Sequence, residues 1–347
     1  MFAERTLMTF KTRKYPFILV VLVLLMLHGC AGIYSVVEFE ILEPATVSLP
    51  AHVKQLIILN RAPLSIKSFE EEDTKGLDGK QLYMLDTMIV KNLSRGLLSI
   101  LQQSPIEKFH HPLWASDRRL DTALLEDLIL TRREVDAMCK EMGADAILSL
   151  ESYYMDLDME AEYYSNSSTE LRTKYYELST NIRWAIYLPG SPRPFDTYTM
   201  SDTLFFPEVI DGIYQSYPSS ASMIRDAFYQ SGIKYGRYLV PVWVHTLRNL
   251  YKGKEDSLRL ASKHTDQGEW DSAYVIWEKL SAGADSTVVA KALHNMAIYH
   301  ELEDNLDSAN QLVTRAMEFD TLEMVRAYKE ELDIRILNRN ELYIQVR

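Results

Sequence analysis

The chain is poor in cysteine and in positive charge, and long hydrophobic runs are rare. Its 347 residues include only two cysteines, Cys30 and Cys139, which excludes a disulfide scaffold and a cysteine-rich zinc module. There are 37 lysines and arginines against 49 aspartates and glutamates, a formal net charge of −12. So acidic a chain lacks the basic field that binding to nucleic-acid phosphates requires. With 47% hydrophobic and 25% charged residues, it is neither a disordered acidic tail nor a polytopic membrane protein.

Motifs of the common enzyme classes are missing as well. The sequence contains no P-loop, Rossmann, nucleophile-elbow or zinc-protease pattern. His110 and His111 lack a spaced glutamate or third ligand, and His245 and His264 have no recognisable partner. We therefore predict that the protein is not an enzyme and has no catalytic residues, cofactor or metal ion. A catalytic site assembled from distant residues is the alternative that one sequence leaves open.

The one long hydrophobic run lies near the amino terminus, at residues 17–27, after four basic residues. As a helix it would rise about 16 Å, against a hydrocarbon core of roughly 30 Å, so it is too short to span a membrane. A basic segment, a short apolar core and small residues before a cleavage site are typical of a secretory signal peptide. We assign residues 1–29 to this signal.

The end of this signal resembles the lipobox of bacterial lipoproteins, in the residues Leu27, His28, Gly29 and Cys30. In that family the chain is cut before the cysteine, which then carries lipid on its sulfur and its new amino group. The resemblance implies that Cys30 is lipidated and anchors the protein to a membrane. No acidic residue follows at 31–35, which in such lipoproteins favours the outer membrane, with the protein facing the periplasm.

Residues 30–252 are predicted to form one domain of the α+β or α/β class, with a mixed sheet. A buried strand is expected at 53–59, an exposed loop at 69–80 and an amphipathic helix at 82–100. A long helical segment is expected at 219–250, bent or broken at Pro241.

A short helix is predicted between the first helix and the central strands. Thr131 and Glu134 have the spacing of a capping box, and Gly143 is a stop signal before the next strand. Cys139 lies beside the apolar face of this helix, so we expect a small buried hydrophobe rather than a reactive thiol.

The hydrophobic period becomes two after residue 152, which predicts an antiparallel meander of three strands ending at residue 206. If residues 166–169 form the first turn, Leu157 pairs with Leu178 and Met159 with Tyr176, and both apolar sets share one side. The opposite face of the first strand is acidic, at Asp156, Asp158, Glu160 and Glu162. We expect a solvated face there rather than a divalent-cation site, which needs ligands from several segments.

Two segments of the carboxy-terminal region align with each other: residues 268–273 are echoed by 304–309, a spacing of 36. The pattern resembles the tetratricopeptide repeat, whose usual period is 34. Asp304 and Thr321 depart from it, where glycine and proline are usual. The resemblance implies an all-α region at 255–347, made of two helix pairs and a capping helix at 322–342. The residues expected to pack these helices are Ala261, Gly268, Trp270, Ala273, Trp277, Ala297, Leu306, Ala309 and Ala316.

Taken together, the lipobox, the strand at 50–60, the junction at 143–148 and residues 239–241 resemble an uncharacterised family of Bacteroidota-type lipoproteins. In that family a domain of unknown function precedes tetratricopeptide repeats. Residues 53–188 are also similar to the periplasmic domain of the curli secretion channel lipoprotein. Neither family supplies catalytic residues.

These features favour a lipid-anchored, non-enzymatic adaptor whose repeats hold another envelope protein on their concave side. One alternative is an oligomeric secretion or assembly component, to which the long meander would contribute strands of a pore. The other alternative is an enzyme with an unrecognised site.

Overall fold

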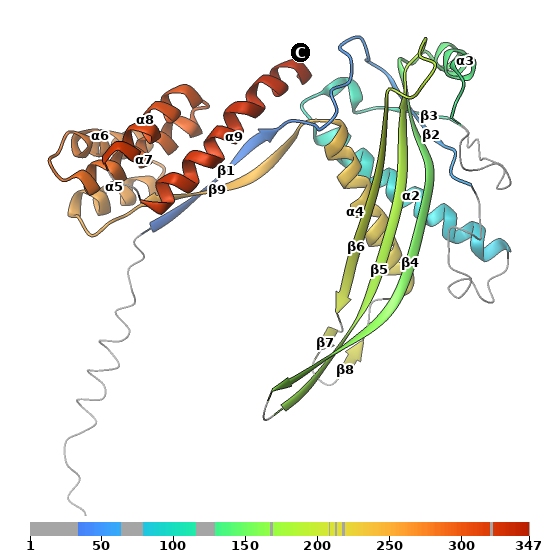
Figure 1. Ribbon diagram of the computed structural model, residues 1–347, viewed down its shortest axis with the longest axis horizontal. Coiled ribbons are helices and arrows are strands. Elements are labelled where there is room, and N and C mark those ends of the chain that lie inside the picture. Colours follow the sequence, from blue (N-terminus) through green and yellow to red (C-terminus); the bar gives the residue numbers. More distant parts are fainter. Residues whose placement is uncertain are drawn as a thin grey trace, which may run out of the picture. The chain divides into compact units, whose positions relative to one another are not determined.

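The structure is a computed structural model (Figure 1), and it describes residues 34–63, 79–115, 129–166, 169–207, 209–211, 214–216, 219–319 and 322–346. The chain divides into two compact units. The helical unit comprises residues 34–39 and His245–Ile336, and the sheet unit comprises Glu40–Val244 and residues from 337 onward. The lipobox residues Leu27, His28, Gly29 and Cys30 and most of the predicted 69–80 loop lie outside the described residues.

The sheet unit is built on a five-stranded sheet in the order β3-β2-β4-β5-β6. Strand β2 is parallel to β3 and to β4, whereas β4, β5 and β6 form an antiparallel meander. The strands are β2 (Leu56–Asn60), β3 (Leu113–Trp114), β4 (Ala146–Asn166), β5 (Thr169–Tyr187) and β6 (Asp196–Pro207). A mixed sheet followed by helices confirms the predicted fold class.

The register of the meander is the predicted one. Leu157 pairs with Leu178 and Met159 with Tyr176, and the first hairpin ends at the pair of Asn166 and Thr169. A shift in register lies between Leu150 and Ser152. Before this bulge the even-numbered residues of β4 belong to the larger core cluster, and after it the odd-numbered residues do. Leu150 and Tyr153 therefore both lie in that cluster.

Two helices, α2 (Gly79–Gln103) and α4 (Ser220–Leu239), cover one face of this sheet (Figure 1). The two helices are in close contact at Gly232, which has no Cβ: one added there would lie 2.0 Å from the Leu93 carbonyl oxygen. The aromatic ring of Tyr235 on α4 stacks on Trp184 of β5 with centroids 4.4 Å apart.

The other face of the sheet packs against α3 (Arg132–Met142) in a second cluster that includes Ile57, Ile147 and Ala185. This helix begins at the predicted capping box of Thr131 and Glu134, and it ends at Gly143, whose φ of 67° is left-handed.

The helix predicted at 219–250 is wrong in its second half. Helix α4 stops at Leu239, and after Pro241 the chain forms strand β9 (Val242–Tyr251). Proline lacks the N–H that would continue the helix, and the following valines, tryptophan and threonine prefer extended backbone. Strand β9 pairs with β1 (Tyr34–Glu43), which had not been predicted, as a two-stranded ribbon. A further short pair joins β7 (Val209–Asp211) to β8 (Tyr214–Ser216), and a 3-10 turn, η2, spans Glu107–Phe109.

The carboxy-terminal region is all-helical, as predicted. Its helices are α5 (Asp256–Asp266), α6 (Trp270–Ser281), α7 (Ser286–Leu302), α8 (Leu306–Phe319) and α9 (Glu323–Gln345). The two inter-helix turns have the same hydrogen bonds: the N–H of Glu269 donates to His264 O, and 36 residues on, the N–H of Asn305 donates to His300 O. Gly268 has a φ of 77°, and Asp304 adopts the equivalent left-handed φ of 54° without being glycine. Among the described residues, no helix is long and apolar enough to cross a membrane.

Candidate functional site

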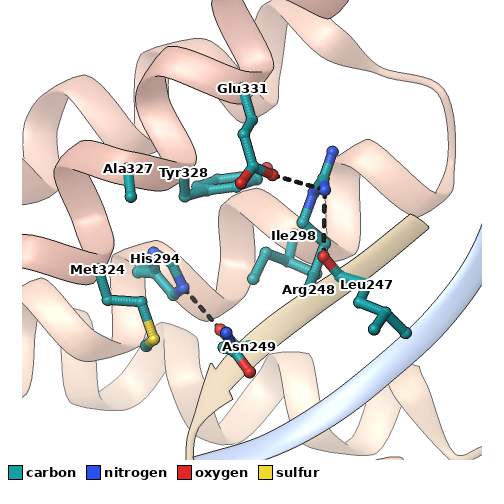
Figure 2. Close-up of a pocket in the computed structure, with 9 residues that line it drawn as sticks. All are labelled: Leu247, Arg248, Asn249, His294, Ile298, Met324, Ala327, Tyr328 and Glu331. Carbon is teal, nitrogen blue, oxygen red and sulfur yellow. Dashed lines mark hydrogen bonds and ion pairs between the residues drawn. The ribbon is translucent and has the colours of Figure 1, made fainter. Parts of the chain in front are cut away.

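Helices α5 and α7 bury an unusual set of polar side chains within the helical unit: Ser262, His294, Asn295 and Glu301. Burying a polar group costs free energy unless it is hydrogen-bonded, so such a set indicates a face built for particular partners. The partners are mostly atoms of strand β9, with Tyr328 and Glu331 of α9 beside them (Figure 2). We call these six residues the strand-binding face.

Asn295 binds the backbone of β9 at Tyr251. The N–H of Tyr251 donates to Asn295 Oδ1 at 2.8 Å, and Asn295 Nδ2 donates to the Tyr251 carbonyl at 2.9 Å. The carboxamide thus makes the two hydrogen bonds that a neighbouring strand would make. Because both contacts are to the backbone, they hold an extended segment with little dependence on its side chains.

His294 makes the next contact along the strand. Its Nε2 lies 2.9 Å from the carbonyl oxygen of Asn249, and since a carbonyl only accepts, Nε2 carries the proton. The ring packs edge-on against Tyr251 and Tyr328, with centroids 5.1 and 5.0 Å away. Burial lowers the pKa of His294 to about 4, although the Asn249 carbonyl and Glu301 oppose this shift. The imidazole is therefore neutral at ordinary pH.

Arg248 is the charged anchor of β9 and is buried. It donates from Nε and Nη2 to the two carboxylate oxygens of Glu301, both at 2.9 Å, and from Nη1 to Glu331 at 2.7 Å. Burial alone would lower the pKa of Arg248, but Glu301 and Glu331 outweigh it and raise this pKa above its ordinary value. Glu301, itself fully buried, also accepts from Arg335 at 3.0 Å. Arg335 in turn reaches Asp304 in the second left-handed turn, at 2.7 Å.

A small cavity of about 60 Å³ lies beside these contacts (Figure 2). Two buried polar atoms in this region, His294 Nδ1 and the Tyr328 hydroxyl, have no hydrogen-bond partner among the described residues. A cavity of about 10–15 Å³ already accommodates one water molecule, so this one suits a few waters and is too small for a cofactor. The contacts at this site are those that hold an extended strand.

The predicted packing residues lie in the helical unit, apart from the strand-binding face. All the predicted alanines, Trp277 and Leu306 are buried in one cluster, while Trp270 is half-buried at its edge. The rings of Trp270 and Trp277 lie 6.5 Å apart. The predicted alanines are Ala261, Ala273, Ala297, Ala309 and Ala316.

Sequence reasoning missed the strand-binding face itself. Arg248 had been placed in a helix, which hid its role. The signal that could have found the others is the pair of polar residues His294 and Asn295 within the largely apolar stretch 288–298 of α7. Two histidines described above as having no partner do have one: His245 Nδ1 lies 3.1 Å from Glu38, and His264 Nδ1 lies 2.6 Å from Glu269.

Cys139 and a metal site are the two remaining candidates that the sequence raised. Cys139 is buried, as expected, and burial raises the pKa of its thiol to about 11, which makes it inert. In the part of the chain that the structure describes, no three histidine, cysteine, aspartate or glutamate residues gather to hold a metal ion.

Comparisons with known proteins give two matches to families without assigned function. A domain of unknown function, DUF8603, matches residues 53–251, and a second, DUF6340, matches residues 259–334. No curated protein matches the chain. A solved neuraminyllactose-binding hemagglutinin homologue from Helicobacter pylori is 12% identical with a TM-score of 0.27, and the alignment covers 56% of this chain and 83% of that one. At that score the likeness supports no statement about fold or binding.

Proposed function

This chain belongs to the DUF8603 family, whose domain of unknown function covers more than half of it, and from that premise we propose that it is a lipid-anchored, non-enzymatic adaptor. It is held at the outer membrane through Cys30, faces the periplasm, and binds another envelope protein through its helical unit. The helix pairs of this unit are tetratricopeptide-like, which is the finer identity that we propose for them.

The observation that carries this proposal is the way the helical unit holds an extended strand. Asn295 and His294 contact the backbone of β9, and Arg248 is locked by Glu301. Helical repeats use such faces to bind protein segments. Here the strand is the chain's own β9, which occupies this face.

A partner would therefore bind the outward side of the ribbon within the helical unit. Tyr34, Val36 and Leu247 expose 48%, 63% and 61% of their surface there, although they are large hydrophobic residues. Alternate residues of a strand lie on opposite faces, so Val36 and Leu247 lie opposite to the neighbouring residues that the helices bury, whereas the exposed ring of Tyr34 packs against the buried ring of Tyr251. We name this set the ribbon face, and its partner is a protein with an apolar surface.

Co-purification from detergent-solubilised envelopes, followed by mass spectrometry, tests the proposal. The double variant Val36→Thr/Leu247→Thr places a β-branched threonine at both positions, so the strands are retained while the apolar surface is reduced. The matched control is Val275→Thr/Ile334→Thr, which alters exposed hydrophobic residues on helices α6 and α9. We expect one specific partner with the wild type and the control, and its loss with the ribbon-face variant. Recovery of no specific partner would refute the adaptor.

A second candidate is an oligomeric secretion or assembly component. The observation that favours it is the length of the hairpin β4–β5, whose strands have 21 and 19 residues. Strands in globular proteins usually have about 3–10 residues. The size of the purified protein in detergent separates the two candidates, because a monomer excludes this one.

A further inference from the structure

A groove in the sheet unit combines apolar and cationic side chains. It has a volume of about 430 Å³ and lies along helix α2, with one residue contributed by α4. Tyr83, Met84 and Met88 supply apolar surface, and Lys91, Arg95 and Arg225 supply charge. Its size is within the roughly 300–1,000 Å³ of ordinary ligand sites. We call it the α2/α4 groove.

Among the described residues, the three cations of this groove have no counter-charge: no carboxylate of that part of the chain lines the groove, and none of the three forms an ion pair or a side-chain hydrogen bond there. Two other cations of the sheet unit, Arg61 and Lys234, are paired with Glu151 and Asp202. Lys91 and Arg95 are also one turn apart on α2, where like charges repel, so a bound anion would relieve this repulsion.

Along α2, the apolar residues of the groove come before the two cations of that helix. Tyr83 and Met84 expose 57% and 62% of their surface, and they lie in the first turns of α2. Arg95 lies 12 residues after Tyr83, which is about 18 Å along a helix axis. Methionine side chains are flexible and polarisable, so they adapt to flexible apolar ligands. The arrangement fits a ligand with an apolar tail at one end and an anionic head at the other.

We propose that the α2/α4 groove binds one molecule of an amphiphile with an anionic head group, such as an anionic phospholipid. Lys91, Arg95 and Arg225 bind the head group, and Tyr83, Met84 and Met88 contact the tail. This site is in the sheet unit and does not depend on the adaptor function proposed for the helical unit.

Native mass spectrometry of the full chain in a neutral detergent tests this proposal. The probes are phosphatidylglycerol, phosphatidylcholine and inorganic phosphate, each titrated separately. We expect one phosphatidylglycerol to bind more tightly than phosphatidylcholine. The variant Lys91→Gln/Arg95→Gln/Arg225→Gln should weaken this binding by about tenfold or more, because each charge-assisted contact is lost. Arg237→Gln, an exposed arginine on α4 outside the groove, is the matched control and should bind as the wild type does.

A tail variant distinguishes a lipid from a free anion. Met84→Ser/Met88→Ser keeps all three cations, and we expect it to weaken phosphatidylglycerol binding severalfold. Inorganic phosphate should bind far more weakly than the lipid. Equal binding of both lipids, equal loss with Arg237→Gln, or tight binding of phosphate that the tail variant leaves unchanged would each overturn the proposal. An acidic peptide that binds the groove where phosphatidylglycerol does not would also overturn it. Thermal melts of every variant establish that it is folded.

Discussion

Replacing Arg248 by methionine should destabilise the helical unit strongly. The substitution removes two hydrogen bonds to Glu301, at 2.9 Å each, and the contact with Glu331 at 2.7 Å. Glu301 is then left buried, with Arg335 as its remaining cation at 3.0 Å. Breaking one side of a buried ion pair typically costs about 3–5 kcal/mol, and since Arg335 stays, we expect about 3 kcal/mol.

The double variant Arg248→Met/Glu301→Leu should recover much of this loss. No carboxylate is then left buried, and Arg335 keeps its contact with Asp304. Apolar replacements of a whole buried pair are often neutral or stabilising. The matched control is Arg259→Met, which removes an exposed pair with Asp256 and should leave stability unchanged within about 0.5 kcal/mol.

Hydrogen exchange of the full chain, read in peptides of α7, measures the effect without requiring the whole chain to unfold in one step. A loss of about 3 kcal/mol should speed exchange in α7 by about 100-fold. Peptides of α2 in the sheet unit serve as the internal reference. The reasoning is refuted if α7 exchanges in Arg248→Met as it does in Arg259→Met. It is also refuted if the double variant loses as much stability as the single variants Arg248→Met and Glu301→Leu lose together.

Four further predictions concern His294, the two tryptophans of the helical unit, Ala273 and Cys30. The folded-state pKa of His294, about 4, lies below the ordinary 6.5. The stability that the folded state gains by burying the neutral imidazole is therefore complete above pH 6.5 and is lost as the pH falls toward 4. That loss amounts to about 3 kcal/mol, and His294→Phe should flatten this part of the pH–stability curve of α7; an unchanged curve would contradict the assigned burial. Trp277→Ala should cost about 3–5 kcal/mol, whereas Trp270→Ala, at a half-buried residue, should cost clearly less; equal losses in thermal melts would refute the packing order. Ala273→Trp should overpack the helix pair and cost about 1–3 kcal/mol, and a wild-type melt would exclude the repeat packing. Cys30→Ala should leave an unlipidated precursor in palmitate labelling, and partition of the unlabelled variant with the outer membrane would refute the anchor.

The parts of the fold that local patterns encode could be predicted from the sequence. The alternation of β4 and β5 defined the register, since a shift by one residue would have exposed the apolar face. The capping box at Thr131 and the stop at Gly143 depend only on neighbouring residues, so they too were predicted correctly. The small residues of the repeat recur with a period that reflects helix packing, and they are buried as that packing requires.

The parts that depend on distant contacts could not be predicted. Residues 242–251 have an ambiguous pattern, and they become a strand because β1 and α7 offer hydrogen bonds to their backbone. For the same reason, the roles of Arg248 and Asn295 were hidden, because each is defined by a partner far along the chain. The α2/α4 groove was missed as well, since Arg225 is far in sequence from Lys91 and Arg95.

The interleaved course of the chain has a consequence for biosynthesis. Residues 34–39 of the helical unit emerge first, but their partner strand at 245–251 and the helices after it are made only when the whole segment Glu40–Val244 has been synthesised. Domains generally fold as units while the chain is produced, at about 5–20 residues per second. Strand β1 therefore exists for on the order of ten seconds or more before β9 is made. During that interval the backbone N–H and C=O groups of β1 lack their partner strand, so another extended segment could pair with them.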